Sequence, residues 1–371
     1  MIRVLQMIAS LDVGGSQTLM MNIYRNIDRE NLQFDFIIDH PKETYFAEEI
    51  RSLGGRVYTL PAFHGTNVGE IRRDWNNFFY THPDYTVLHS HVRSYASLYL
   101  PVAKEHGLKT IIHSHNSTNG SGMTAAVKAF LQKPLRYQAD ILMACSTEAG
   151  KWLYGERACR SDRFIFLPNG VDTRRFAPDE ERRRRTRQEL GLGNAWVIGH
   201  VGRFYEQKNH RFLLEIFQQV HQRDPEAILL LVGVGPLQQE MAQRAVELGI
   251  AEKVLMTGNR DDVPELLAAM DVFALPSLFE GLPVTLIEAQ AAGLPCVITD
   301  NITSDLDVTP LLRRLPLGDA AQWADALLER RPHLDTRQAL VRAGFDIRAS
   351  ARMLSELYLR LDREAREARG K

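Results

Sequence analysis

Residues 271–295 have the sequence DVFALPSLFEGLPVTLIEAQAAGLP and contain a strand, a loop and a helix in succession. The apolar run that ends at Pro276 is short and shows no polar alternation, which is typical of a strand buried on both faces of a parallel sheet. Pro283 suits the first turn of a helix, and this helix is predicted to run to about Gly293. The segment therefore predicts one strand–loop–helix unit of an α/β protein.

Short apolar runs of the same kind recur along the chain, separated by segments long enough for amphipathic helices. In the first half they occupy residues 4–8, 34–38, 56–60, 86–89, 110–113, 141–144 and 164–167. In the second half they occupy residues 196–201, 227–232, 253–257, 272–275 and 296–299. Repeated strand–helix–strand units predict parallel sheets covered by helices. The predicted fold class is α/β, with two parallel-sheet domains in tandem.

The segment PNGVD at residues 168–172 interrupts this pattern, and four consecutive arginines follow at residues 182–185. We place the domain junction here, which gives an N-terminal domain at residues 1–175 and a C-terminal domain at 190–345. No aromatic residues interleave the arginines, so a solvated linker helix explains them better than a nucleic-acid patch. A cleft between two such domains is a favoured place for a ligand.

Composition and charge exclude several classes of protein. The chain has 371 residues, of which 44% are hydrophobic and 25% charged, as in ordinary globular proteins. Its 45 basic and 46 acidic residues give a net charge of −1, which predicts no general attraction to nucleic acid. Three scattered cysteines do not form a disulfide framework or a zinc site. No apolar stretch approaches the roughly 20 residues that span a membrane, and the N-terminus leaves no room for a signal peptide. We therefore expect a cytoplasmic protein.

Two glutamates of the first segment are candidate ligand-binding groups. Glu280 precedes the predicted helix, and Glu288 lies more than one turn inside it, among apolar residues. The two carboxylates are placed to hold hydroxyl groups of one elongated ligand, and the free N–H groups of the helix start would meet a phosphate between them. A capping role for Glu280 and a solvated position for Glu288 would leave the apolar surroundings of Glu288 unexplained.

Glycines and cations follow the first strand of each domain. Gly14 and Gly15 allow a tight turn before the first helix, without the full G-x-G-x-x-G pattern of a dinucleotide site. Arg203 and Lys208 hold the same position in the second domain, where two cations could neutralise a departing diphosphate. Simple turns and surface solvation remain the alternatives for these features taken singly.

Four histidines occur in two pairs at the ends of predicted strands, His89 with His91 and His113 with His115. Alternation along a strand places the members of each pair on the same side. No acidic ligand accompanies them at metal-site spacing, so a hydrogen-bonding or acid–base role fits better than a metal site. A packed strand-end histidine is an equal alternative for any single one.

Taken in order, these motifs resemble the family-4 retaining glycosyltransferases, in the branch that builds bacterial exopolysaccharide and capsule. The motifs are Gly14-Gly15, the PNGVD segment, Gly202-Arg203 with Lys208-Asn209, Gly233-Val-Gly235-Pro236, the glutamates of an E-x7-E signature at 280 and 288, and the segment His113-Ser-His115-Asn116. The resemblance covers nearly the whole chain and is most specific over residues 196–300. It implies the GT-B fold, in which two Rossmann-like domains face each other across a cleft. It also implies that the last helix, at about residues 350–371, packs back on the N-terminal domain.

The resemblance also implies roles for individual residues. The groups with an implied catalytic role are Glu280 at the donor sugar, Arg203 and Lys208 at the diphosphate, and His115 near the transferred sugar. The groups with an implied donor-binding role are Gly15, Arg203, Lys208, Asn259, Arg260, Gly281, Leu282 and Glu288, of which Glu288 would bind the ribose and Asn259 and Arg260 the base. No metal ion and no cofactor are implied, because cations and a helix N-terminus take the place of a metal. No residue after Glu288 is assigned, because residues 301–309 lack the small-residue run often found there.

The implied function is transfer of a hexose from a nucleotide sugar, with UDP the commonest carrier, to a lipid-linked or oligosaccharide acceptor. Two other hypotheses stay open: a nucleotide-sugar epimerase or hydrolase of the same fold, and a non-catalytic nucleotide-sugar-binding subunit of an assembly complex. Peripheral contact with the inner face of the membrane is also open. Residues 124–136 combine basic and apolar side chains, although a buried crossover helix with a solvated edge explains them equally well.

Overall fold

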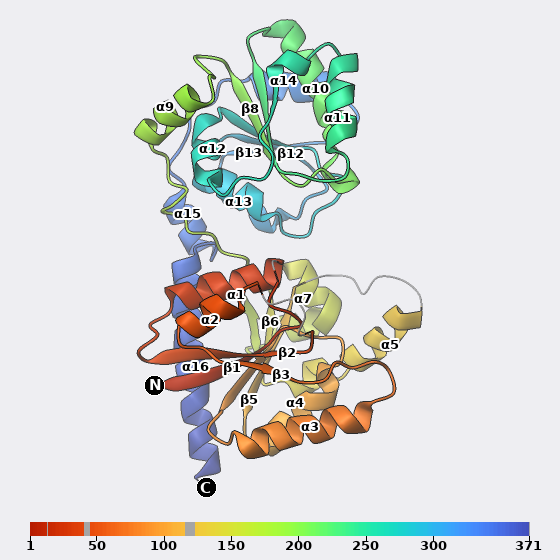
Figure 1. Cartoon of the computed structure of the whole chain (residues 1–371), viewed down its shortest axis with the longest axis vertical. Coiled ribbons are helices and arrows are strands. Elements are labelled where there is room, and N and C mark those ends of the chain that lie inside the picture. The colour runs from red at the N-terminus through yellow and green to blue at the C-terminus, as the bar shows by residue number, and fades with distance from the viewer. Residues whose placement is uncertain (13, 41–44, 116–122, 371) are drawn as a thin grey trace. The chain divides into compact units, whose positions relative to one another are not determined.

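The structure is a computed structural model that describes residues 1–12, 14–40, 45–115 and 123–370. The chain forms two compact units (Figure 1). Unit 1 consists of residues 1–169 and 347–371, and unit 2 consists of residues 170–346. Each unit is described by itself.

Unit 1 is built on a seven-stranded sheet with the order β3-β2-β1-β4-β5-β6-β7, in which all neighbouring strands are parallel. The strands are β1 (Ile2–Met7), β2 (Leu32–Ile38), β3 (Val57–Thr59), β4 (Val87–Ser90), β5 (Lys109–Ser114), β6 (Ile141–Ala144) and β7 (Phe164–Phe166). Each of the seven strands predicted for this half of the chain is therefore present.

The helices of unit 1 cover this sheet (Figure 1). They are α1 (Gly15–Asn26), α2 (Ala47–Ser52), α3 (Val68–Thr81), α4 (Ala96–Glu105), α5 (Met123–Gln132), α6 (Leu135–Gln138), α7 (Thr147–Tyr154), α8 (Glu156–Cys159) and α16 (Ile347–Arg369). The C-terminal helix α16 packs against α1, and its Leu354, Tyr358 and Leu361 are buried in one core cluster with Val4 and Phe34. The last helix of the chain is thus part of the unit that contains the N-terminus.

Unit 2 is built on a six-stranded parallel sheet with the order β10-β9-β8-β11-β12-β13. Its strands are β8 (Val197–Val201), β9 (Ile228–Val232), β10 (Val254–Met256), β11 (Val272–Leu275), β12 (Cys296–Thr299) and β13 (Leu312–Leu315). Its α-helices are α9 (Glu180–Glu189), α10 (His210–Arg223), α11 (Gln238–Glu247), α12 (Val263–Ala269), α13 (Val284–Ala291), α14 (Ala320–Leu328) and α15 (Arg337–Arg342), and its 3₁₀ turns are η1 (Glu206–Lys208), η2 (Ala251–Lys253) and η3 (Ser304–Leu306).

The sequence did not predict β13, the edge strand with the sequence LRRL. An edge strand pairs on one side only, so it needs no continuous apolar run. Its two central arginines are only partly buried, and Arg314 pairs with Asp307 at 2.7 Å. The apolar-run criterion therefore missed the one strand of this sheet that carries charge.

The predicted fold class, two Rossmann-like parallel-sheet domains, is confirmed. In both sheets the first strand lies in the interior. The next two strands are added on one side of it, and the following strand is added on its other side. This reversal creates a switch point between β1 and β4 in unit 1 and between β8 and β11 in unit 2. Ligands of open α/β sheets bind beside the carboxyl ends of the strands at such points.

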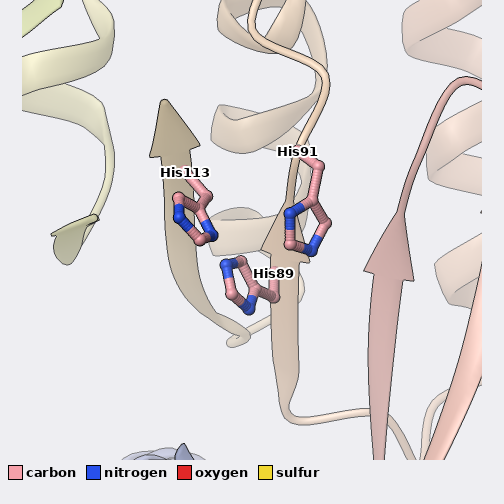
Figure 2. Close-up of side chains that lie close together, drawn as sticks. All are labelled: His89, His91 and His113. Carbon is pink, nitrogen blue, oxygen red and sulfur yellow. The ribbon is translucent and has the colours of Figure 1, made fainter. Parts of the chain in front are cut away.

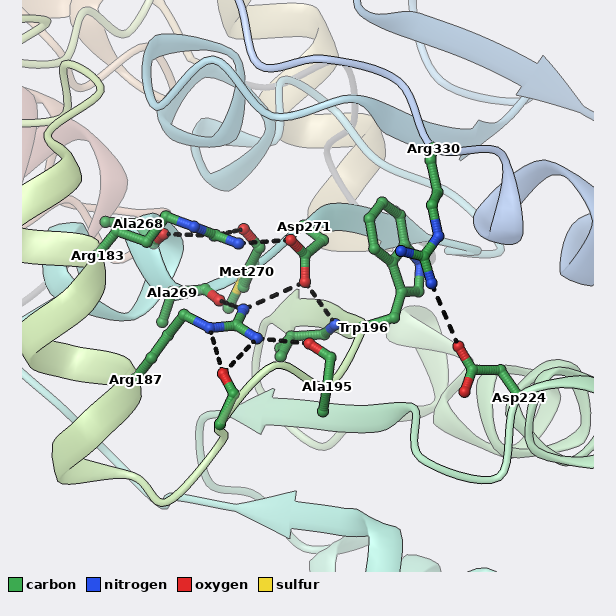
Figure 3. Close-up of polar contacts among 12 residues, drawn as sticks. Arg183, Arg187, Ala195, Trp196, Asp224, Ala268, Ala269, Met270, Asp271 and Arg330 are labelled. Atoms are coloured by element: carbon green, nitrogen blue, oxygen red, sulfur yellow. Dashed lines mark hydrogen bonds and ion pairs between the residues drawn. The ribbon is translucent and has the colours of Figure 1, made fainter.

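The interpretation of residues 182–185 as a solvated linker helix is wrong, because α9 belongs to unit 2 and packs on α12. Figure 3 shows how two of its arginines are held. Arg183 Nη2 donates to Asp271 Oδ1 at 2.5 Å, and Arg187 Nη1 donates to Asp271 Oδ2 at 3.2 Å. Both guanidinium groups also donate to backbone carbonyls at the end of α12, those of Ala268, Ala269 and Met270.

The unit boundary also differs from the predicted junction. Unit 2 begins at Gly170, so residues 170–175 and the helix α9 are part of it rather than of the N-terminal domain or a linker. A parallel bridge between Val171 and Asp346, with a hydrogen bond from Thr173 to Asp346 at 2.6 Å, ties the first residues of unit 2 to its last.

Candidate functional site

The loop after β8 forms one wall of the candidate site in unit 2. It contains the 3₁₀ turn η1 and then Asn209, whose φ of 55° lies in the left-handed region that few residues other than glycine adopt. The Asn209 side-chain amide donates to the Pro276 carbonyl at 3.1 Å. The loop after β8 is thereby fixed against the loop after β11, across the switch point.

Lys208 and Glu280 meet at this point. Lys208 Nζ lies 2.5 Å from Glu280 Oε1, and only 15% and 7% of the two side chains are exposed. Ser277 donates its hydroxyl to Oε1 at 2.8 Å, and Gln207 donates its amide to Oε2 at 3.1 Å. The Glu280 carboxylate is therefore held by one cation and two neutral donors, and it is not a helix cap.

Glu288 lies on α13, the helix that follows the loop after β11. Burial raises the pKa of its carboxyl group to about 7. Nearby Arg175 opposes this rise but does not cancel it. A carboxyl group whose pKa is raised by burial gains from hydrogen-bond donors that favour its ionised form. The hydroxyl groups of a bound ligand are donors of this kind.

The close approach of two loops explains two glycines of the predicted motif. A Cβ atom on Gly233, whose φ is 137°, would lie 2.2 Å from the Gly202 carbonyl oxygen. A Cβ atom on Gly235 would lie 2.5 Å from the Phe204 carbonyl oxygen. These glycines let the loop after β9 pack on the loop after β8, so their first role is to shape the site.

The other predicted donor-binding residues of unit 2 are more exposed. Arg203 is exposed and its guanidinium lies over the Tyr205 ring, 5.0 Å from the ring centroid. Arg260 is exposed and pairs with Asp262 at 2.5 Å, and its neighbour Asn259 is also exposed. The structure therefore places these groups at the surface, with Arg203 on the same loop as Lys208.

The loop between β11 and α13 contains the last two predicted residues. Gly281 is exposed, and a Cβ atom there would meet no atom within 4 Å, so packing alone does not require glycine. Leu282 is partly buried and packs against the core of unit 2. Thr285, in the first turn of α13, has a buried hydroxyl without a hydrogen-bond partner among the described residues.

Two buried histidines beside Lys208 were missed by the sequence reasoning. His200 lies on β8 and donates from Nδ1 to the Ala274 carbonyl, 2.9 Å away, while His210 begins α10 and stacks on Phe204 with the ring centroids 4.1 Å apart. Burial and the charge of Lys208 lower the pKa of both, that of His210 to about 4. The sequence showed only a single histidine within a predicted strand and another directly after Asn209, a pattern that does not indicate a site.

In unit 1 the four predicted histidines form one cluster at the ends of β4 and β5. The rings of His89 and His91 lie 4.3 Å apart and those of His113 and His115 lie 4.0 Å apart, as alternation along the strands predicted. His91 Nδ1 lies 2.9 Å from His115 Nε2. Burial lowers the pKa of all four, that of His115 to about 3 with help from Arg93, so each imidazole is neutral at pH 7.

Gly15 is the first residue of α1, directly after the cap residue Gly14, and a Cβ atom on it would meet nothing within 4 Å. The N–H groups of this helix start are available to an anion. Asn116, the last residue of the predicted histidine segment, lies outside the described residues. Gly15 and His115 belong to unit 1, whereas the remaining predicted site residues belong to unit 2.

Helix α5 has an apolar and basic surface. Phe130 is 71% exposed and Val127 is 46% exposed. In a buried crossover helix, the alternative given for this segment, both side chains would be covered. A cavity of about 610 Å³ lies beside this helix and is lined by Phe63, Tyr95 and Leu131 together with Lys128. Within the described part of the chain, no helix is both long and apolar enough to cross a membrane.

Comparison with known proteins identifies relatives for both halves of the chain. Residues 13–175 match the model described as glycosyltransferase family 4, and residues 195–330 match that described as glycosyl transferases group 1. EpsF of Bacillus subtilis (strain 168), which its name assigns provisionally as a glycosyltransferase, is 33% identical over 368 residues and covers 96% of each chain. An Escherichia coli UDP-Gal:alpha-D-GlcNAc-diphosphoundecaprenol alpha-1,3-galactosyltransferase is 27% identical over 228 residues, 58% of each chain.

A solved structure supports the fold. The crystal structure of Anabaena HepE in complex with UDP superposes with a TM-score of 0.72 and covers 100% of both chains, at 18% identity.

Proposed function

Because the chain belongs to the family-4 glycosyltransferases and has their GT-B fold, we propose that it transfers a hexose, with retention of anomeric configuration, from a UDP-sugar to a lipid-linked or oligosaccharide acceptor. We place this reaction in the cytoplasm, in the synthesis of bacterial exopolysaccharide or capsule. The observation that carries the proposal is the Lys208–Glu280 pair, with its Gln207 and Ser277 donors, at the switch point of the unit 2 sheet.

The proposed donor site follows from the charges of this region. Lys208 and Arg203 hold the diphosphate and stabilise the charge that develops on it as it leaves. Lys208 is nearly buried, and a fixed cation acts most strongly where water is excluded. The Glu280 carboxylate accepts hydrogen bonds from hydroxyl groups of the donor sugar. The glycosidic bond to the diphosphate breaks, the acceptor oxygen bonds to the same face of the anomeric carbon, and the acceptor proton passes to the leaving phosphate.

The remaining predicted residues complete the proposed donor contacts. Glu288 accepts hydrogen bonds from the ribose hydroxyls. Asn259 and Arg260 contact the base. The backbone of Gly281 and Leu282, before the start of α13, contacts the phosphates. For unit 1, we keep the roles that the resemblance implies, with Gly15 at the diphosphate and His115 near the transferred sugar. The proposed transfer requires no metal ion.

The proposed acceptor fits two features of unit 1. A cavity with apolar walls beside Lys128 suits a molecule with a phosphate and an apolar chain, and a relative is named for an acceptor linked to diphosphoundecaprenol. Exposed Phe130 and Val127 on the same basic helix suit peripheral contact with an anionic membrane surface. We propose that the protein meets its acceptor at this surface.

A thermal-shift series with UDP, GDP, ADP and their glucose conjugates, with and without EDTA, tests the donor. Saturation at about 100 times the dissociation constant adds about 2.7 kcal/mol of stability, which is easily measured. We expect a shift with UDP and UDP-sugar that EDTA leaves unchanged. A shift with GDP alone would contradict the uridine carrier, and no shift with any nucleotide would contradict the donor site.

The same preparation, given UDP-sugar with and without an extract of lipid-linked oligosaccharides, separates the proposed function from its alternatives. We expect release of UDP that depends on the acceptor. Conversion or hydrolysis of the donor without an acceptor would favour an epimerase or hydrolase, and tight binding without turnover would favour a binding subunit.

Glu288→Gln is expected to weaken UDP binding about 10–100-fold at pH 8, because hydrogen bonds to a charged acceptor contribute about 1.5–3 kcal/mol. In the wild type the carboxyl group has a pKa raised to about 7, and donation by the ribose favours its ionised form. Binding therefore releases a proton below about pH 7, so UDP affinity rises with pH through this range and levels off above it. Isothermal titration calorimetry in buffers of different ionisation enthalpy measures both effects.

Glu288→Gln also serves as the control for the proton measurement. The phosphate of UDP itself releases protons as the pH rises, and this release is the same in the variant, so the difference between the two proteins reports Glu288. The raised pKa means that the folded chain binds more protons than the unfolded chain between about pH 4.5 and 7, so ionised Glu288 costs stability above that range. The variant should therefore be at least as stable as the wild type at pH 8. Equal proton release in both proteins would contradict the assignment of Glu288 to the ribose.

A further inference from the structure

We propose that His89, His91 and His113 bind one divalent transition-metal ion of the Zn²⁺ class in unit 1, at a site distinct from the donor site. Figure 2 shows the three imidazoles turned toward one another at the ends of β4 and β5. One ring nitrogen from each residue lies within 4.8 Å of those of the other two. The proposal concerns a bound ion outside the transfer chemistry, so it does not depend on the proposed function.

Burial makes this cluster different from a surface group of histidines. His89 and His113 are fully buried and His91 is 9% exposed. His89 Nε2 and both ring nitrogens of His113 have no hydrogen-bond partner among the described residues. Leaving buried nitrogens unpaired is costly, and a metal ion would satisfy His89 Nε2 and one of the two His113 nitrogens together.

The surroundings hold two of the three imidazoles as metal sites do. Ligating histidines usually donate their second ring N–H to an oxygen, which fixes the orientation of the ring. His89 Nδ1 lies 2.6 Å from the Tyr358 hydroxyl, and His91 Nε2 lies 3.1 Å from Gln6 Oε1. The Gln6 amide nitrogen in turn donates to the Tyr358 hydroxyl at 3.3 Å. Gln6 and Tyr358 are therefore linked to each other and together orient the rings of His89 and His91.

The set of donors selects the kind of ion. All three ligands are imidazoles that are neutral at pH 7, and the cluster found among the described residues includes no carboxylate. Imidazole suits zinc, copper, nickel and cobalt, whereas Mg²⁺ and Ca²⁺ prefer oxygen ligands. Zn²⁺ with three histidines is a known coordination set. Its ligand nitrogens lie about 3.3 Å apart, for Zn–N bonds of about 2.0–2.1 Å, so the three nitrogens, which lie within 4.8 Å of one another, would move closer together on binding.

The expected role is to hold the ends of β4 and β5 together beneath His115. His115 Nε2 lies 2.9 Å from His91 Nδ1, and its ring lies 4.0 Å from that of His113. Because Gln6 holds Nε2 of His91, its ligand atom would be Nδ1, so the ion would replace the His115 contact there and would fix the His113 ring that lies against His115. His115 is in this respect the link between the metal cluster and the proposed sugar site.

Zinc binding by the full chain, with any purification tag removed, tests the proposal. After treatment with a chelator, the protein is titrated with Zn²⁺ in competition with a chromophoric chelator, and with Co²⁺ by visible absorption. We expect one Zn²⁺ per chain and the absorption bands of Co²⁺ bound by nitrogen ligands. His113→Gln should weaken zinc binding more than about 100-fold, since changes to outer partners alone cost about 10–100-fold.

His210→Gln is the matched control. His210 is buried, both its ring nitrogens are unpaired like those of His113, and a second imidazole, His200, lies beside it. It lacks a third histidine, so His210→Gln should keep the zinc affinity of the wild type. Tyr358→Phe, which keeps the ring and removes the hydroxyl that orients His89, should weaken binding about tenfold and serves if His113→Gln does not fold.

Three outcomes would overturn the proposal. They are less than stoichiometric zinc in the wild type, equal zinc affinity in the wild type and the variants of His113 and Tyr358, and displacement of zinc by an equal amount of Mg²⁺. The UDP thermal shift is measured on the same samples, so loss of the donor site and loss of the metal site are seen separately.

Discussion

Replacing Lys208 by alanine is expected to lower kcat about 10²–10³-fold, while the dissociation constant of UDP changes less than about tenfold. Lys208 is nearly buried and lies 2.5 Å from Glu280. A cation in such a place stabilises the charge of a leaving diphosphate far more than a solvated one, and that charge is greatest in the transition state. Steady-state release of UDP and calorimetric binding of UDP measure the two effects separately.

Lys253→Ala is the matched control for this experiment. Lys253 lies in the same unit, where it pairs with Glu226 at the surface at 3.1 Å, so its loss should leave kcat unchanged. Lys208→Arg keeps the charge and should recover part of the rate. A kcat of Lys208→Ala within about threefold of the wild type would contradict the role of Lys208 in the transfer.

A double-mutant cycle shows whether Lys208 and Glu280 act as one unit. Glu280→Gln keeps one acceptor oxygen, for either Ser277, which donates to Oε1, or Gln207, which donates to Oε2, and it removes the charge that Lys208 pairs with. Because the two side chains are in contact, the effects of their substitution should be far from additive, with the double variant little slower than the slower single variant. Additive effects would mean that each side chain acts on the donor independently.

Replacing Asp271 by alanine is expected to destabilise unit 2 by about 3–5 kcal/mol, because breaking a buried ion pair leaves charges without a partner. Asp271 is 12% exposed and accepts from Arg183, from Arg187 and from the backbone N–H of Val197 at 2.7 Å. Figure 3 shows the two arginines of α9 held by Asp271 and by the carbonyls at the end of α12. Because Asp271 also accepts from Val197 at the start of β8, its loss should affect all three elements together. Urea unfolding followed by tryptophan fluorescence measures the change.

Asp325→Ala is the control for Asp271→Ala. Asp325 also pairs with an arginine, Arg223, but 68% of its side chain is exposed, so the expected loss is below about 1 kcal/mol. Equal stability of the Asp271 and Asp325 variants would show that α9 is held by something other than this cluster.

The sequence predicted the architecture well because the evidence for it is local. Strands buried on both faces must be apolar along their length, so the central strands are visible as short runs. The edge strand β13 was not predicted, and the helix α9 was wrongly interpreted as a solvated linker, for the opposite reason: their evidence is not local. Arg314 and Arg183 find their partners only after distant segments have packed, and charge in a sequence looks the same whether it is solvated or paired.

The candidate site was predictable in part. The positions of Glu280 before α13 and Glu288 within it follow from the strand–loop–helix pattern alone, and so does the place of Lys208 after β8. The pairing of Lys208 with Glu280 could not be predicted, because the two residues are 72 positions apart and meet through a switch point in the strand order. His200 and His210 were missed for the same reason.

By itself, the sequence determined the two α/β domains, the family and the positions of the motif residues, because these depend on local pattern and order along the chain. Only the tertiary structure decided that α9 belongs to unit 2, that Glu280 has a cation at 2.5 Å, and that three imidazoles at the ends of two strands lie close together. Each of these depends on the distance between residues remote in sequence, and on burial that gives their charges and unpaired nitrogens their energetic weight.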